Sequence, residues 1–140
     1  MTASTSYRLS GDLKRRLAAR AAAEGITETS LVVRTLDEGL RVAQYPGIVY
    51  RDGPSGRRAG LAGGPDVWEV ILAIRHARGP GDAKVARAAE EMEIPERLAR
   101  LAVDYAAAHP DEIEERIKLN DEAAERARAL AAQRARLLGP

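Results

Sequence analysis

The first 41 residues constrain the fold most, because they encode one short strand and two helices but no second strand. A lone strand leaves its backbone N–H and C=O groups unpaired, and about 40 residues bury little apolar surface by themselves. We therefore expect the strand to pair antiparallel with its copy from a second chain. The strand itself is predicted by strict alternation, which is typical of a half-buried β-strand. Thr5, Tyr7 and Leu9 fall on one side, and Ser4, Ser6 and Arg8 fall on the other.

Capping residues bound the two helices that follow. Ser10 is a favourable N-cap with Asp12 in the first turn, and Gly25 suits the left-handed residue that ends a helix. Thr27 caps the second helix, which is predicted to end near Gln44. Both helices carry an apolar stripe, formed by Leu13, Leu17 and Ala21 in the first and by Val32, Val33, Leu36 and Leu40 in the second. The alternative is a helical hairpin whose first nine residues are a disordered tail.

The polar side of such a two-stranded ribbon predicts DNA binding. A β-ribbon with polar side chains outward fits the major groove, where Ser4, Ser6 and Arg8 would face the base edges. Arg8 is the best candidate, because a guanidinium can grip guanine O6 and N7 in a bidentate manner. The free N–H groups at the start of the second helix are expected to hold a backbone phosphate. The candidate phosphate-binding residues there are Thr27, Thr29 and Ser30.

Residues 4–41 resemble a ribbon-helix-helix domain of the CopG/Arc/MetJ kind. The resemblance is carried by the alternating strand, by Leu9-Ser10, and by residues 25–32 at the turn between the helices. It implies an intertwined homodimer, or a higher even oligomer, that binds double-stranded DNA. Ser4 and Ser6 are short where such proteins often carry a long basic or amide side chain, so base readout would depend on few contacts.

Composition excludes several classes of protein. The 140 residues have a formal net charge of +1 and contain no cysteine, which excludes disulfides and thiolate metal sites. No apolar run approaches the ~18 residues of a transmembrane helix, so we expect a cytoplasmic protein without a membrane partner. His76 and His109 fall on separate predicted helices, and no phosphate-binding glycine motif occurs. We expect no catalytic residue, no metal, no cofactor and no enzymatic activity.

Three segments with different charge suggest three parts. Residues 1–44 carry +2, residues 45–78 carry +2 and residues 79–140 carry −3. We predict a ribbon-helix-helix domain over 1–44, a β-hairpin plus helical domain over 45–110, and a charged C-terminal helix or arm over 111–140. The N-terminal part is mildly basic and the C-terminal part is acidic. This distribution suits a protein that binds an anionic partner through its N-terminal part and a different partner through its C-terminal part.

The predicted second domain begins with a hairpin. Ile48–Arg51 forms its first strand, and residues 57–62 return as the second after a turn rich in glycine and proline. Arg57 and Arg58 are expected to keep the edge of the sheet in contact with solvent. The alternative is that they contact a phosphate group or a partner protein. Asp66 caps an almost wholly apolar helix over 67–77, a pattern that predicts burial. Trp68 is expected to anchor this core, and His76 to be a structural residue on the same helix.

Three more helices are predicted to complete the chain. Two begin near Asp82 and Pro95, and their short connection is compatible with a helix-turn-helix. The last runs from Asp111, in a capping-box-like start with Glu114, to about Leu138. Its distal half has little to bury within one subunit, so it is a solvated arm, a frayed tail, or a helix lying in a groove on a partner. Expected ion pairs along it are Glu112–Arg116, Glu114–Lys118 and Glu122–Arg126.

A second resemblance covers roughly residues 45–117. The stretches 45–53, 56–63 and 66–70, with residues 101–106 and 111–113 later, are similar to a small helix-turn-helix-like domain of antitoxins encoded beside PIN-like toxins. Gly63-Gly64-Pro65 replaces the Gly-Thr-Arg-like loop that usually precedes the central helix in that family. The resemblance implies a PIN-like ribonuclease as the protein partner.

The sequence therefore predicts a mostly α fold with short β elements: an intertwined ribbon-helix-helix dimer, then a β-hairpin and a helical domain with a long C-terminal helix. The function expected is that of a type II antitoxin that binds operator DNA, represses its own operon and neutralises a PIN-like ribonuclease toxin. Two alternatives stay open. One is a free-standing repressor without a toxin, and the other is a scaffolding protein that does not bind DNA.

Overall fold

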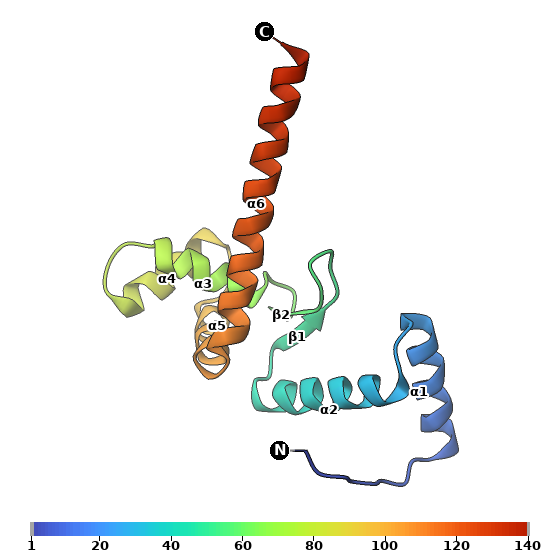
Figure 1. The fold of residues 1–140 in the computed structure, drawn as a ribbon. Helices are drawn as coiled ribbons and strands as arrows, with labels where there is room; N and C mark the ends of the chain where they lie inside the picture. Colours follow the sequence, from blue (N-terminus) through green and yellow to red (C-terminus); the bar gives the residue numbers. More distant parts are fainter. Residues whose placement is uncertain (1, 140) are drawn as a thin grey trace. The chain divides into compact units, whose positions relative to one another are not determined.

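The computed structural model describes residues 2–139, which form two compact units with their sequence boundary between Gln44 and Tyr45. The chain is mostly helical, with one small antiparallel sheet (Figure 1). The coarse prediction of a mostly α fold with short β elements is thus confirmed. Unit 1 holds α1 and α2, and unit 2 holds β1, β2 and α3 to α6.

Unit 1 consists of α1 (Gly11–Glu24) and α2 (Glu28–Gln44), and the predicted caps bound both helices. The Ser10 hydroxyl accepts the Leu13 N–H at 3.1 Å. Gly25 ends α1 with a left-handed φ of 67°, a conformation that glycine adopts without steric cost. The Thr27 hydroxyl accepts the Ser30 N–H at 3.0 Å. These short-range predictions are confirmed because a cap depends on neighbouring residues alone.

Residues 2–10 precede α1 as exposed chain that belongs to neither a helix nor a strand of the single chain. The predicted strand within this segment would pair with the same strand of a second copy, and a single chain cannot form that pair. The strand and the ribbon-helix-helix dimer therefore stay predictions.

Unit 2 begins with the predicted hairpin. Strands β1 (Ile48–Arg51) and β2 (Arg58–Leu61) pair antiparallel, with Ile48 opposite Leu61 and Arg51 opposite Arg58. Four helices follow: α3 (Val67–His76), α4 (Gly81–Glu91), α5 (Glu96–Ala108) and α6 (Pro110–Leu138). Helix α3 contacts β2, α4, α5 and α6, so it is the element on which the unit is built.

The core of unit 2 lies between the hairpin and α3 to α6, and its largest fully buried side chain is Tyr105. Two expectations about α3 were wrong. Trp68 is only partly buried and packs on the rim of the core, and His76 is exposed. Helix α3 is apolar nearly all round, yet only Val67 and Val70 are fully buried, because its neighbours cover part of its circumference.

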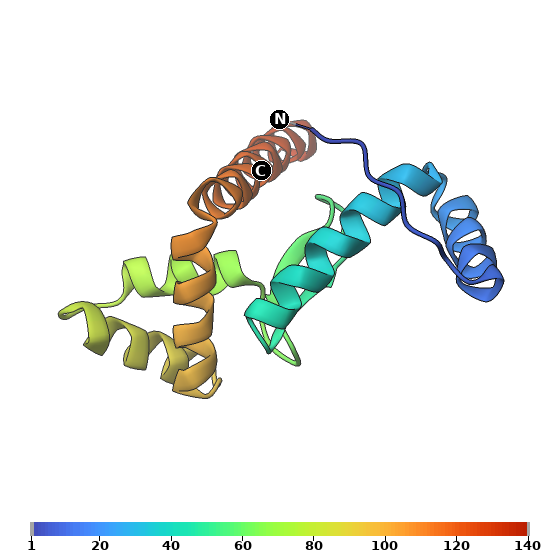
Figure 2. The same cartoon turned by 90° about the horizontal axis from the view of Figure 1, so that it is seen from below.

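Helix α6 begins with Pro110 at its first position, one residue before the predicted start, and runs to Leu138. Its predicted capping box is replaced by a tertiary contact, because Arg75 of α3 holds the Glu114 carboxylate. Only Ile113 and Ile117 of α6 are buried, and residues 125–139 are exposed throughout. In Figures 1 and 2 the C-terminal half of α6 extends away from α3, α4 and α5. Within residues 2–139, no helix is both long and apolar enough to cross a membrane.

Candidate nucleic-acid interface and supporting clusters

The three predicted base-reading residues lie on the exposed segment before α1. Ser4, Ser6 and Arg8 are all exposed, and no hydrogen bond or ion pair of the described residues involves them. Their side chains are therefore available to a ligand. Their alternation with Thr5, Tyr7 and Leu9 places them on the opposite side of an extended chain from the apolar positions.

The predicted phosphate-binding residues gather at the N-terminus of α2. Thr27, Thr29 and Ser30 are exposed there, and the Thr27 hydroxyl also donates to the Ser30 Oγ at 2.9 Å. Because Thr27 already takes the Ser30 N–H, the amides that remain for an anion are those of Glu28 and Thr29. Thr29 and Ser30 line a shallow hollow together with Val33, Arg34 and Asp37. The structure brings these three residues together, whereas no hydrogen bond or ion pair of the described residues joins them to Ser4, Ser6 or Arg8.

An ion-pair cluster fastens α1 to α2 beside this hollow. Arg34 of α2 donates to the Glu24 carboxylate at 2.7 Å, and Arg20 donates to its other oxygen at 2.5 Å. The hydrogen bond from Arg34 is the main reason that the pKa of Glu24 is lowered, and Arg20 adds to it. The Arg34 charge is thus neutralised within the unit, which leaves the backbone N–H groups as the candidate phosphate donors.

Unit 1 leaves its large apolar side chains uncovered. Of its described residues only Ala21 and Leu31 are buried. Seven large apolar side chains are exposed on residues 2–10 and on the two helices, and one of them is Val42 near the end of α2. We call the other six the dimer stripe: Tyr7, Leu9, Leu13, Val33, Leu36 and Leu40. Leu40 is 72% exposed and Val33 is 63% exposed, values that are unusual for side chains spaced on one helical face.

In unit 2 a buried carboxylate ties the hairpin to α3. Asp66, which is 5% exposed, accepts from Arg51 Nη1 at 2.8 Å and from the Arg58 guanidinium. Arg51 and Arg58 lie directly opposite each other in the sheet, where two like charges repel unless a carboxylate neutralises them. Arg51 also donates to the Gly64 carbonyl at 2.8 Å. The expectation that Arg58 only solvates an edge was therefore wrong, and the cluster holds the fold together.

A second polar network surrounds Tyr105 at the centre of the core. Its hydroxyl lies 2.9 Å from the Tyr50 hydroxyl and donates to the Glu112 carboxylate at 2.9 Å. Tyr45 and His109 pack against its ring with centroids 5.5 and 4.7 Å away. The network joins β1, α5 and α6, so it fixes the base of α6. Periodicity alone did not reveal it, because its members lie up to 67 positions apart in the sequence.

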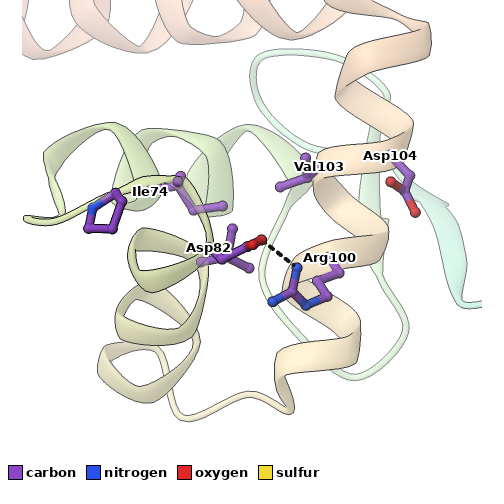
Figure 3. Close-up of a pocket in the computed structure, with 8 residues that line it drawn as sticks. Ile74, Asp82, Arg100, Val103 and Asp104 are labelled. Carbon is purple, nitrogen blue, oxygen red and sulfur yellow. Dashed lines mark hydrogen bonds and ion pairs between the residues drawn. The ribbon is translucent and has the colours of Figure 1, made fainter.

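An open groove runs along α3, α4 and α5 (Figure 3). Its volume is about 720 Å³, and Ile74, Val85 and Val103 form its apolar lining. Arg100 spans its rim, donating to Asp82 at 3.0 Å and to Glu96 at 2.7 Å. Those two carboxylates, Asp82 first, raise the pKa of Arg100. Asp104 lines the same groove without an ion pair to any described residue.

The charge of α6 changes sign along its length. We call residues 111–125 the acidic segment, which carries seven Asp or Glu against one Arg and one Lys. We call residues 126–139 the distal arm, which carries four Arg and no Asp or Glu. The tail is therefore acidic only near the body of unit 2. Leu130, Leu137 and Leu138 of the distal arm are 59%, 86% and 79% exposed.

No protein-family model, curated protein or solved structure matches the chain. Within residues 2–139, no group of three His, Asp or Glu side chains is placed to hold a metal ion.

Proposed function

We propose that the protein is a dimeric DNA-binding antitoxin. Unit 1 pairs with a second copy through residues 4–9 and the dimer stripe, and Ser4, Ser6 and Arg8 then face the major groove of operator DNA. Thr27, Thr29 and Ser30 position a backbone phosphate. Unit 2 and the acidic segment of α6 bind a PIN-like ribonuclease and neutralise it, so the same protein represses its operon and restrains the toxin.

The dimer stripe is the observation that carries the proposal. The six large apolar side chains of the dimer stripe are exposed, while the described part of unit 1 buries only Ala21 and Leu31. Each buried aliphatic side chain contributes about 1.5–3 kcal/mol, so covering this stripe with a second copy supplies the core that unit 1 lacks. The capped helices and the unpaired polar side chains before α1 are in keeping with that arrangement.

The toxin assignment is supported by the acidic segment. Of its seven carboxylates, Asp111, Glu114, Glu115, Asp121 and Glu125 are exposed. A ribonuclease needs a basic surface to hold RNA, and an acidic helix complements such a surface. The core contacts of Ile113 and Ile117 anchor the start of this segment rigidly, which lowers the entropic cost of binding.

The runner-up is a free-standing repressor without a toxin. The distal arm favours it, because four arginines at the exposed end of α6 would repel a basic nuclease surface. Co-expression with the product of the adjacent gene separates the two functions. Co-purification of a small nuclease supports the antitoxin, and a neighbour that neither binds nor is toxic supports the repressor.

Substitution of Arg8 tests the DNA-binding half of the proposal. Arg8→Ala should weaken binding to the cognate operator by about 1–3 kcal/mol in an electrophoretic mobility or anisotropy titration. Arg8→Lys is the matched control, because it keeps the charge and removes the bidentate grip on guanine. It should retain binding to unrelated DNA and lose most of the preference for the operator. Unchanged operator affinity in both variants would remove Arg8 from base readout.

A further inference from the structure

The distal arm of α6 has an apolar face that nothing in its own unit covers. Leu130, Arg134 and Leu137 follow one another at i, i+4 and i+7, a spacing that places them on one helical face. Ala127 and Leu138 widen the same face. The arm thus presents leucines flanked by arginines, with an arginine between them.

The groove on the body of unit 2 has the complementary chemistry. Its lining combines apolar residues with three charged ones, and its volume of about 720 Å³ is large enough for several leucine side chains. Asp82 and Asp104 are among its lining residues, and Figure 3 shows Asp82 beside Arg100 and Asp104 at the other edge of α5. Arg100 neutralises Asp82, whereas Asp104 has no cationic partner among the described residues. An amphipathic helix with one basic side chain among its leucines fits such a groove.

The arm cannot reach the groove of its own chain. Helix α6 is continuous from Pro110 to Leu138, and its last buried residue is Ile117. The 21 residues from Ile117 to Leu138 span about 32 Å at 1.5 Å per residue, directed away from α3, α4 and α5 (Figure 1). Folding back would require breaking the helix, which costs several backbone hydrogen bonds in water.

We infer that the distal arm of one copy docks in the groove of a second copy. Leu130 and Leu137 enter the aliphatic lining formed by Ile74, Val85 and Val103, and Arg134 pairs with the free carboxylate of Asp104. The exchange is reciprocal, so two copies cover two grooves and two arms. It involves unit 2 alone and depends on neither the DNA nor the toxin.

Disulfide trapping tests this contact cleanly, because the chain contains no cysteine. Full-length Leu137→Cys protein is mixed with Ile74→Cys protein that carries a larger tag, and the mixture is oxidised mildly. A disulfide between the two different chains is expected on a non-reducing gel. Ala107→Cys is the matched control, since it is exposed on α5 and does not line the groove. It should cross-link to Leu137→Cys at least about tenfold more slowly.

A charge exchange tests the predicted ion pair. Asp104→Arg and Arg134→Asp should each slow the cross-link by roughly tenfold, and the two together should restore it. Three results would overturn the inference: no cross-link above the Ala107→Cys control, a disulfide only between two Leu137→Cys arms, or an intrachain disulfide in a chain carrying both cysteines. Operator binding, measured on the same samples, reports on unit 1 separately.

Discussion

At the residue scale, Asp66 is the side chain on which unit 2 most depends. It neutralises two arginines that face each other across the hairpin, and its backbone N–H donates to Glu69 at 2.8 Å at the start of α3. Removing one partner of a buried ion pair leaves an uncompensated charge and costs about 3–5 kcal/mol. Asp66→Ala should therefore lower the free energy of unfolding of unit 2 by that amount. Trp68, the only tryptophan, reports on this transition by fluorescence.

The matched control for that substitution is Asp82→Ala. Asp82 also pairs with an arginine, but its side chain is 90% exposed, so solvent screens the pair. Its loss should change the unfolding free energy by less than about 1 kcal/mol. Equal effects of the two substitutions would show that the Asp66 cluster is not the tie between hairpin and α3.

Glu24 makes the stability of unit 1 depend on pH. Arg34, with Arg20, lowers the pKa of Glu24 in the folded protein below its value in the unfolded chain. The stability it contributes is therefore fully present above the unfolded pKa and is lost as the pH falls through the folded pKa. Glu24→Gln should flatten the decline of the unit 1 melting temperature between about pH 5 and about pH 3. In unit 2, the hydrogen bond from Arg75 lowers the pKa of Glu114 in the same way. Glu114→Gln should therefore flatten the acid decline of the melting temperature of unit 2 and not that of unit 1.

Residues that act on their immediate neighbours were predictable from the sequence, and residues that act over a distance were not. Ser10, Gly25 and Thr27 cap helices through contacts within four positions, and all three behave as predicted. Arg116 was expected to pair along α6, yet it donates to the carbonyl of Ser55, 61 positions away. A long basic side chain reaches several partners, and only the folded chain decides among them.

At the scale of elements, each helix and the hairpin followed from periodicity and turn chemistry, whereas their degree of burial did not. The sequence of α3 is apolar on nearly all sides, but the neighbouring elements bury only Val67 and Val70 fully. The length of α6 was predicted closely: the predicted range of 111 to about 138 differs by one residue from the observed Pro110–Leu138. The difference in charge between its two halves was not predicted. The net charge was counted over residues 79–140, and that sum hid the change of sign at residue 126.

The dimer stripe on α2 yields a prediction for this scale. Leu36→Asp should raise the dissociation constant of the dimer by roughly 30-fold or more, since burying an unpaired carboxylate costs at least about 2 kcal/mol. Thr35→Asp adds the same charge one residue away, on a different face of the helix, and should leave the constant within about threefold. Sedimentation equilibrium measures both in the full chain carrying Asp104→Arg, which weakens the proposed arm exchange of unit 2. A dimer that tolerates Leu36→Asp as well as Thr35→Asp does not use this stripe.

At the scale of the whole molecule, the proposed function separates its two tasks between the units. DNA binding uses unit 1, and toxin capture uses unit 2 with the acidic segment. A truncation after His109 would test this division poorly, because it also removes Ile113 and Ile117 from the core. Substitutions on the exposed surface of α6 leave the core intact and are the sharper probe.

The combined variant Asp121→Asn, Glu122→Gln and Glu125→Gln removes three carboxylates beyond the last buried residue of α6. Long-range attraction to a basic nuclease surface should fall, so the association rate with the toxin should drop by at least about tenfold at low salt and less at high salt. Operator binding should not change. Glu90→Gln with Glu91→Gln, at the end of α4, is the control for charge loss elsewhere on unit 2. If both variants capture the toxin equally fast, the acidic segment does not guide it, and the body of unit 2 must make the contact.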